Sequence, residues 1–130
     1  MTRDNTHARR PDCRFPRQVR LLHSRDFQTV FTHAECKSSD RYFTLLARRN
    51  DFAYPRLGLA ITKKKIKTAV ARHALKRLVR ESFRHNKALL AGLDIVVMGS
   101  SAAGQTDKPV LFEHLLKQWH GLARRCAGSA

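Results

Sequence analysis

The side chains best able to do chemistry in this sequence are cations, and one segment concentrates them. Residues 63–84 hold nine Lys or Arg and one acid, Glu81, so this segment carries a net charge of +8, half of the +16 of the whole chain. Ammonium and guanidinium groups donate strong hydrogen bonds to phosphate oxygens, and each phosphate that they neutralise releases condensed counterions. The segment therefore indicates binding to a polyanion, and nucleic acid is the default one.

A helix would sort this segment into two faces. At about 100° per residue, the apolar residues gather on one side: Ala71, Leu75, Leu78, Val79 and Phe83. Most of the cationic residues gather on another side: Arg72, His73, Lys76, Arg77, Arg80 and Arg84. Like charges four residues apart destabilise an isolated helix by roughly 0.2–0.5 kcal/mol per pair. A merely solvated face would mix both signs of charge, so we expect this cationic face to bind phosphates.

Protein-borne catalysis would need residues that the sequence does not group. A nuclease needs clustered carboxylates for Mg²⁺, or two histidines placed with a lysine, whereas the ten acids here are scattered. His73 and His85 are twelve residues apart, too far to share a site on one helix. Cys13, Cys36 and Cys126 include no C-x-x-C pair, and no histidine stands at zinc-site spacing. We therefore expect no catalytic residue, metal or cofactor on the protein itself, and a reducing cytoplasm as its compartment.

Length and composition fit one domain with a basic tail. The chain has 130 residues, of which 42% are apolar, and seven Phe and one Trp can anchor a single core. No stretch approaches the roughly 20 apolar residues of a membrane-spanning helix, and the Arg-rich amino-terminal segment lacks the apolar region of a secretory signal. We expect a disordered basic tail over residues 1–20, one RNA-binding domain over 21–125 and a C-terminal tail over 126–130.

Hydrophobic periodicity and turn residues predict three helices and three strands. The helices begin at N-caps at Ser24, Thr68 and Asp107, and the second of them extends to about residue 90. The strands lie over residues 41–48, 56–62 and 94–98. A polar turn over 35–40 follows the first helix, and a small-residue loop over 99–106 precedes the last one. We expect the first two strands to pair. The last helix should cover the sheet with Leu111, Leu115, Leu116, Trp119 and Leu122. This order predicts an α/β two-layer domain.

Three blocks of sequence stand in an informative order. They are RLL at 20–22 with RDFQTVF at 25–31, PRLGL at 55–59 with KK at 63–64, and RHALKRLVRESFR at 72–84. Their order and spacing are similar to those of the bacterial ribonuclease P protein family, whose signature in the last block reads Arg-Asn-Arg, then Lys-Arg, then Arg-Glu. The resemblance extends from about residue 16 to residue 98. Two positions depart from it, because His73 replaces the Asn and Ala74 replaces the second Arg.

The resemblance implies a fold and a function. The fold is a small α+β sandwich of order α-β-β-(β)-α-β-α with a left-handed βαβ crossover, contrary to the usual right-handed rule. The function is that of an accessory subunit, which assists a catalytic RNA that uses Mg²⁺ to remove the 5′ leader of precursor tRNA. The cationic face would dock on the catalytic RNA, and the leader would lie between the first helix and the sheet. We assign to the leader the aromatic, apolar and basic residues Phe27, Phe31, Leu46, Lys63 and Lys64.

Several alternatives stay open from the residues alone. Phe27 and Phe31 could pack in the core instead of stacking on RNA, and Arg56 could reach RNA or merely flank a strand. A structural RNA binder such as a ribosomal protein shares the size and charge, and only the spaced blocks separate the two classes. We expect neither a membrane nor a small-molecule substrate as a partner, since the apolar faces are needed for a core.

Overall fold

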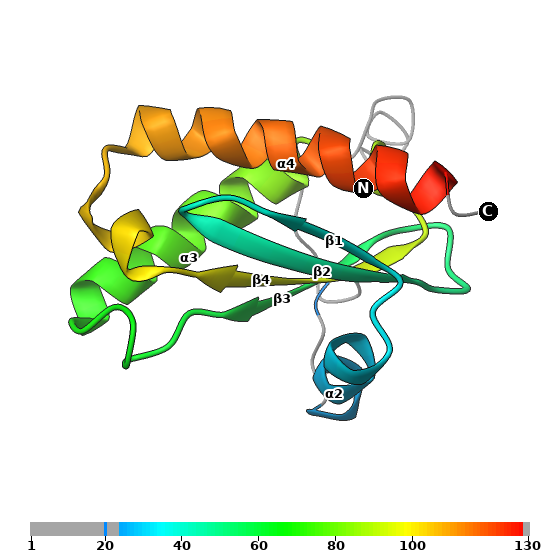
Figure 1. The fold of residues 1–130 in the computed structure, drawn as a ribbon, viewed down its shortest axis with the longest axis horizontal. Helices are drawn as coiled ribbons and strands as arrows, with labels where there is room; N and C mark the ends of the chain where they lie inside the picture. The colour runs from blue at the N-terminus through cyan, green and yellow to red at the C-terminus, as the bar shows by residue number, and fades with distance from the viewer. Residues whose placement is uncertain (1–19, 21–23, 129–130) are drawn as a thin grey trace, which may run out of the picture.

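One four-stranded sheet organises the chain (Figure 1). The computed structural model describes Arg20 and residues 24–128. The strands, in the sheet order β1-β2-β4-β3, are β1 (Cys36–Ser39), β2 (Phe43–Arg49), β4 (Leu93–Gly99) and β3 (Arg56–Ala60). The helices are α2 (Ser24–Thr32), α3 (Ala69–Arg84) and α4 (Lys108–Gly128), with a 3-10 turn, η2 (Ser101–Gln105), before α4. The predicted α+β architecture is thus confirmed.

The main core lies between the sheet and the helices α3 and α4. Alternate residues of β2 point into it, so Phe43, Leu45 and Ala47 are buried while their neighbours are half-buried. Trp119 of α4 is fully buried, and its indole Nε1 donates a hydrogen bond of 2.8 Å to Ser82 of α3. The long apolar faces of α3 and α4 therefore cover one side of the sheet, as the periodicity predicted.

The helix α2 lies against the opposite face of the sheet (Figure 1). Val30 of α2 and Val96 of β4 are fully buried against each other, and half-buried apolar residues surround them: Phe27, Leu46, Ala60 and Met98. This second cluster is small, and the apolar residues around Val96 are half-buried rather than buried. Among the described residues, α3 and α4 therefore cover one face of the sheet broadly, whereas α2 covers the other face only around Val96.

The segment predicted as a polar turn over residues 35–40 contains the edge strand β1 instead. Cys36 and Ser38 are buried while Lys37 and Ser39 are exposed, which is the alternation of a strand. The buried residues of this strand are small rather than large and apolar. Such a strand lacks the β-branched and aromatic residues by which strands are recognised. Cys36 also forms a disulfide with Cys126 of α4, with the two Cα atoms 5.6 Å apart. The edge strand is thus fastened to the last helix.

The predicted pairing of the first two long strands is wrong. β3 pairs parallel with β4, and β4 lies between β2 and β3. Residues 93–97 of β4 are all buried, which suits a central strand covered on both faces. β3 is shorter and goes to the edge, where Leu57 also bridges Arg20. The left-handedness of the β3-α3-β4 crossover stays a prediction.

Element ends differ from expectation in two places. α3 ends at Arg84 rather than near residue 90, because the Asn86 side chain donates to the Ser82 carbonyl and the Asn86 backbone N–H bonds to the Phe83 carbonyl. The predicted C-terminal tail begins too early, since α4 continues to Gly128 and Cys126 is buried. Of the predicted tail over 1–20, only Arg20 lies within the described residues.

No helix in the described part has the length and apolarity to cross a bilayer.

Candidate RNA interface

Helix α3 presents a cationic face built as the sequence predicted. Its N-cap is Thr68, whose hydroxyl oxygen accepts a hydrogen bond of 3.1 Å from the Ala71 backbone N–H. The residues that anchor its other side in the core are Leu75, Leu78, Val79 and Phe83. The predicted cationic residues lie outside that core: His73, Arg77 and Arg80 are exposed, and Arg72, Lys76 and Arg84 are half-buried. We call these six residues the α3 cationic face.

Two members of the α3 cationic face are engaged within the protein. Arg72 donates from Nη1 to the carbonyls of Ile66 and Lys67, at 2.9 and 3.1 Å, and so fixes the entry into the helix. Arg84 makes a two-pronged ion pair with Glu81 at 2.9 Å. That hydrogen bonding, with a contribution from His85, lowers the pKa of Glu81. Both cations are therefore less available to an external phosphate.

The other four members make no such contact with the described residues. In the part of the chain that the structure describes, His73, Lys76, Arg77 and Arg80 make no ion pair with a carboxylate. They follow one another along the helix at spacings of three, one and three residues, and the pairs His73–Arg77 and Lys76–Arg80 are four residues apart, so their side chains share one side of it. Three cations, Lys76, Arg77 and Arg80, with the hydrogen-bonding ring of His73 beside them, form a cluster on one helix that is suited to the phosphates of a folded nucleic acid.

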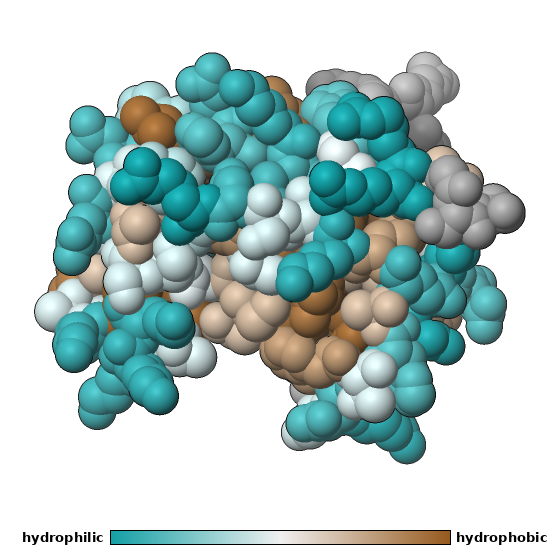
Figure 2. Space-filling view, viewed as in Figure 1, coloured by the Kyte–Doolittle hydropathy of each residue, from teal (hydrophilic) through white to brown (hydrophobic). Residues whose placement is uncertain are grey.

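A second surface lies where α2 meets the sheet. We call it the α2 cleft, and its apolar lining consists of Phe27, Leu46, Ala60 and Met98 around Val30 and Val96. Figure 2 shows apolar surface in the hollow between α2 and the segment that follows β3. Lys63 and Lys64 are exposed in that segment. The hollow thus combines apolar contact area with cations at one rim, which suits a single-stranded nucleic acid.

The predicted leader residues occupy different positions in the α2 cleft. Phe27 is half-buried and packs on the apolar lining, so it both contributes to the core and borders the hollow. Phe31 is 42% exposed at the end of α2. Leu46 lies opposite Val96 in the sheet register and on the same face as α2. The structure therefore brings Phe27 and Leu46 together and leaves Phe31 at the margin.

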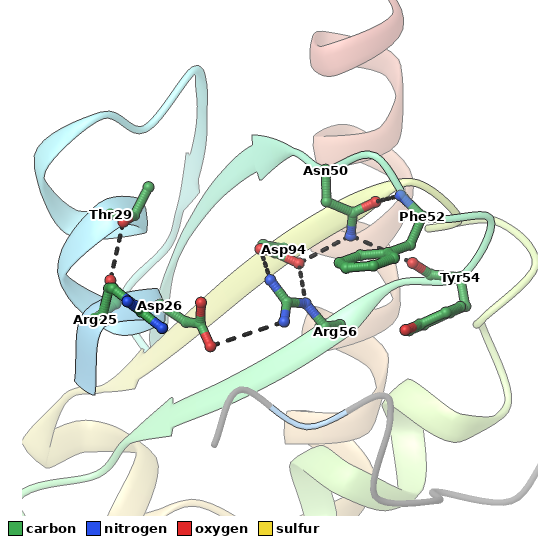
Figure 3. A network of polar contacts seen from close by, with 8 residues as sticks. All are labelled: Arg25, Asp26, Thr29, Asn50, Phe52, Tyr54, Arg56 and Asp94. Carbon is green, nitrogen blue, oxygen red and sulfur yellow. Dashed lines mark hydrogen bonds and ion pairs between the residues drawn. The ribbon is translucent and has the colours of Figure 1, made fainter. Parts of the chain in front are cut away.

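Sequence reasoning missed a polar network at one end of the α2 cleft (Figure 3). Arg56 of β3 donates from Nε and Nη2 to the two carboxylate oxygens of Asp94 on β4, at 2.8 and 2.6 Å. Asn50 donates to the same carboxylate at 2.8 Å. The hydrogen bonding to Asp94 raises the pKa of Arg56, although burial opposes the shift. The sequence does place opposite charges in two of the strands. The pair can be recognised only once the β3–β4 register is known, because that register places Arg56 beside Asp94.

Comparison with known proteins places this chain in one family. The family model for ribonuclease P matches residues 15–123. The chain belongs to the ribonuclease P protein family. The ribonuclease P protein component of Methylococcus capsulatus is 49% identical over 116 residues, which cover 89% of this chain and 90% of that protein. The corresponding protein of Pseudomonas aeruginosa is 47% identical over 110 residues, covering 85% and 82%.

A solved ribonuclease P protein has the same fold. The protein from Thermotoga maritima superposes with a TM-score of 0.70 at 35% identity, covering 78% of this chain and 94% of that chain. The family match extends from before α2 into α4, so both the α3 cationic face and the α2 cleft of this ribonuclease P protein lie inside it. The similarity predicted from the spaced blocks is confirmed.

Proposed function

We propose that this chain is the protein subunit of ribonuclease P and assists a catalytic RNA in removing the 5′ leader from precursor tRNA. The observation that carries the proposal is the presence of two chemically different surfaces on one rigid domain. The α3 cationic face offers mainly charge, whereas the α2 cleft offers apolar area with cations at its rim.

The two surfaces suit two kinds of RNA. Helical RNA is recognised mainly through its shape and phosphates, so we assign the catalytic RNA to the α3 cationic face. A single-stranded leader exposes unstacked bases, so we assign it to the α2 cleft, with Phe27, Phe31 and Leu46 contacting bases and Lys63 and Lys64 contacting phosphates. Only precursor tRNA has a leader, and this second contact would therefore favour substrate over product.

The chemistry of cleavage belongs to the RNA in this proposal. Within the described residues, no three His, Cys, Asp or Glu side chains come together in a group able to hold a metal ion. We assign Mg²⁺ to the RNA subunit, as the resemblance to the family implies, and cytoplasm as the compartment. The protein contributes binding and charge neutralisation, which should matter most when Mg²⁺ is scarce.

Reconstitution tests the proposal directly. The full-length protein should restore 5′ maturation of precursor tRNA by the cognate catalytic RNA at a Mg²⁺ concentration too low for the RNA alone. The double variant Arg77→Ala/Arg80→Ala should weaken binding to the catalytic RNA. Each lost phosphate contact should also reduce the slope of log affinity against log salt by about 0.7–0.9.

A matched control separates a docking site from general charge. Lys117 and Arg124 are exposed on α4 and also make no ion pair among the described residues. The double variant Lys117→Ala/Arg124→Ala removes the same net charge and should leave the salt slope nearly unchanged. Equal losses for the two double variants would argue against docking through α3, and no rescue of maturation would refute the proposed function.

A further inference from the structure

Arg56 connects three elements at one end of the α2 cleft (Figure 3). From β3, its guanidinium uses Nε and Nη2 to hold Asp94 of β4. The remaining nitrogen, Nη1, lies 3.8 Å from Oδ2 of Asp26, which belongs to α2. One side chain thus forms ion pairs with the sheet and with the helix that covers it.

The guanidinium is sheltered and held in one orientation. The side chains of Arg56, Asp26 and Asp94 are only 19%, 22% and 11% exposed. The guanidinium carbon lies 4.8 Å from the centroid of the Phe52 ring, and the Asn50 amide donates a hydrogen bond to the Asp94 carboxylate. Because its position is fixed by the sheet, Arg56 presents Nη1 to α2 as a fixed charge rather than as a mobile one.

Helix α2 depends on external contacts for its placement. It has nine residues, fewer than the roughly 12–15 below which an isolated helix is marginal in water. Among the described residues, its apolar contact with the sheet is a small cluster centred on Val30 and Val96. Asp26 is the residue immediately before Phe27, so an ion pair at Asp26 also constrains where the Phe27 ring lies.

We propose that Arg56 is a positioning residue for the leader of precursor tRNA: through Asp26 it holds α2 in a fixed position relative to β3, and so sets the width of the α2 cleft. The inference rests on the proposed function, because it assumes that the leader occupies this cleft. Lys could not replace Arg56, since one ammonium group cannot pair with both oxygens of Asp94 and still face Asp26.

The variant Asp26→Asn tests this role while leaving the Arg56–Asp94 pair in place. It removes one negative charge, so general electrostatics predicts tighter binding of every RNA. A positioning role predicts the opposite for the precursor alone. In the reconstituted holoenzyme, we expect precursor tRNA to bind roughly two- to fivefold more weakly, as for loss of one ion pair, with mature tRNA and the catalytic RNA not weakened.

Three companion variants sharpen the result. Glu113→Gln makes the same charge change at an exposed position of α4, on the covered side of the sheet, and should not lower the precursor-to-mature affinity ratio. Asp26→Glu should restore the ratio to within about twofold, because it restores the ion pair. Arg56→Lys should reproduce the loss seen with Asp26→Asn. All ratios are measured well below the melting temperatures of the variants, so that a folding defect does not enter.

The outcomes separate the two ideas. An unchanged ratio for Asp26→Asn, or one that rises as in Glu113→Gln, would overturn the positioning role while leaving the proposed function intact. A wild-type holoenzyme that does not prefer precursor over mature tRNA would refute leader binding, and the inference about Arg56 would be refuted with it. Faster amide hydrogen exchange over residues 26–31 of Asp26→Asn, with exchange in α3 unchanged, would support a displaced α2.

Discussion

Replacing Asp94 by Asn should destabilise the domain through its effect on Arg56. The carboxylate accepts two hydrogen bonds from that guanidinium and one from Asn50. Asn keeps the shape of Asp but loses the charge. Arg56 is then left mostly buried, and among the described residues the carboxylate opposite it is that of Asp26, at 3.8 Å. The pair lies across the β3–β4 register, in which Arg56 stands directly opposite Asp94.

The expected magnitude follows from burial. Removing one partner of a fully buried ion pair costs about 3–5 kcal/mol. Arg56 is 19% exposed, so water can partly solvate the orphaned cation, and the Asn oxygen still accepts one hydrogen bond. We therefore expect a loss of about 2–3 kcal/mol in the free energy of unfolding. At about 4 °C per kcal/mol for a domain of this size, the melting temperature should fall by about 8–12 °C.

Urea titration of the full-length protein gives the measurement. The midpoint should fall while the slope of unfolding free energy against urea stays constant. Asp51→Asn, an equal charge change in the exposed β2–β3 connection, is the control and should cost less than about 0.5 kcal/mol. Arg56→Met and the double variant Arg56→Met/Asp94→Asn complete a double-mutant cycle. The coupling energy between the two side chains should be about 2 kcal/mol. A coupling below about 0.5 kcal/mol would refute the assignment of stability to this pair.

Three other predictions concern single residues. Phe27→Ala should weaken precursor tRNA about tenfold, as for loss of one base-stacking contact, and a gel-shift series in which mature tRNA lost as much would assign Phe27 to packing alone. Thr68→Ala should cost about 1 kcal/mol of unfolding free energy, because the Ala71 N–H loses its cap; a loss under about 0.3 kcal/mol in urea would contradict that capping bond. A ¹³C titration should find the pKa of Glu81 below its ordinary value, because Arg84 hydrogen-bonds the carboxylate. Any stabilisation from Glu81 is therefore present above the pKa of this group in the unfolded chain, and it is lost as pH falls through the lowered pKa of the folded protein. An ordinary pKa would mean that the Glu81–Arg84 ion pair does not form in solution.

The features visible in the sequence were those with a local period. Leu75, Leu78 and Val79 repeat at helical spacing, and this repeat alone is enough to locate both the core side and the cationic side of α3. Thr68 was recognisable as an N-cap because capping is decided within one turn. The residues for RNA contact in α3 follow from the same local pattern, and their contact with RNA stays a prediction.

The features hidden in the sequence depend on partners far along the chain. β1 has no apolar signature of its own, and it is a strand because Ser38 and Cys36 meet Leu45 and Ala47 in the register with β2. Arg56 and Asp94 are 38 residues apart, and only the parallel pairing of β3 with β4 makes them neighbours. Strand order is set by which strand can be buried on both faces, a property of the assembled sheet.

When the disulfide between Cys36 and Cys126 is formed, it closes a covalent ring over residues 36–126, and α2 lies outside that ring. In the reducing cytoplasm proposed above, the same two cysteines would be thiols. With the bond formed, a protease cut anywhere between the two cysteines would leave both fragments joined until a thiol reductant was added. A cut in the short connection between Thr32 and Cys36 would instead release α2 at once. Limited digestion, run on gels with and without reductant, would therefore distinguish two kinds of cut. One removes α2 from the α2 cleft, and the other lies between the two cysteines, in the part of the chain that carries the α3 cationic face.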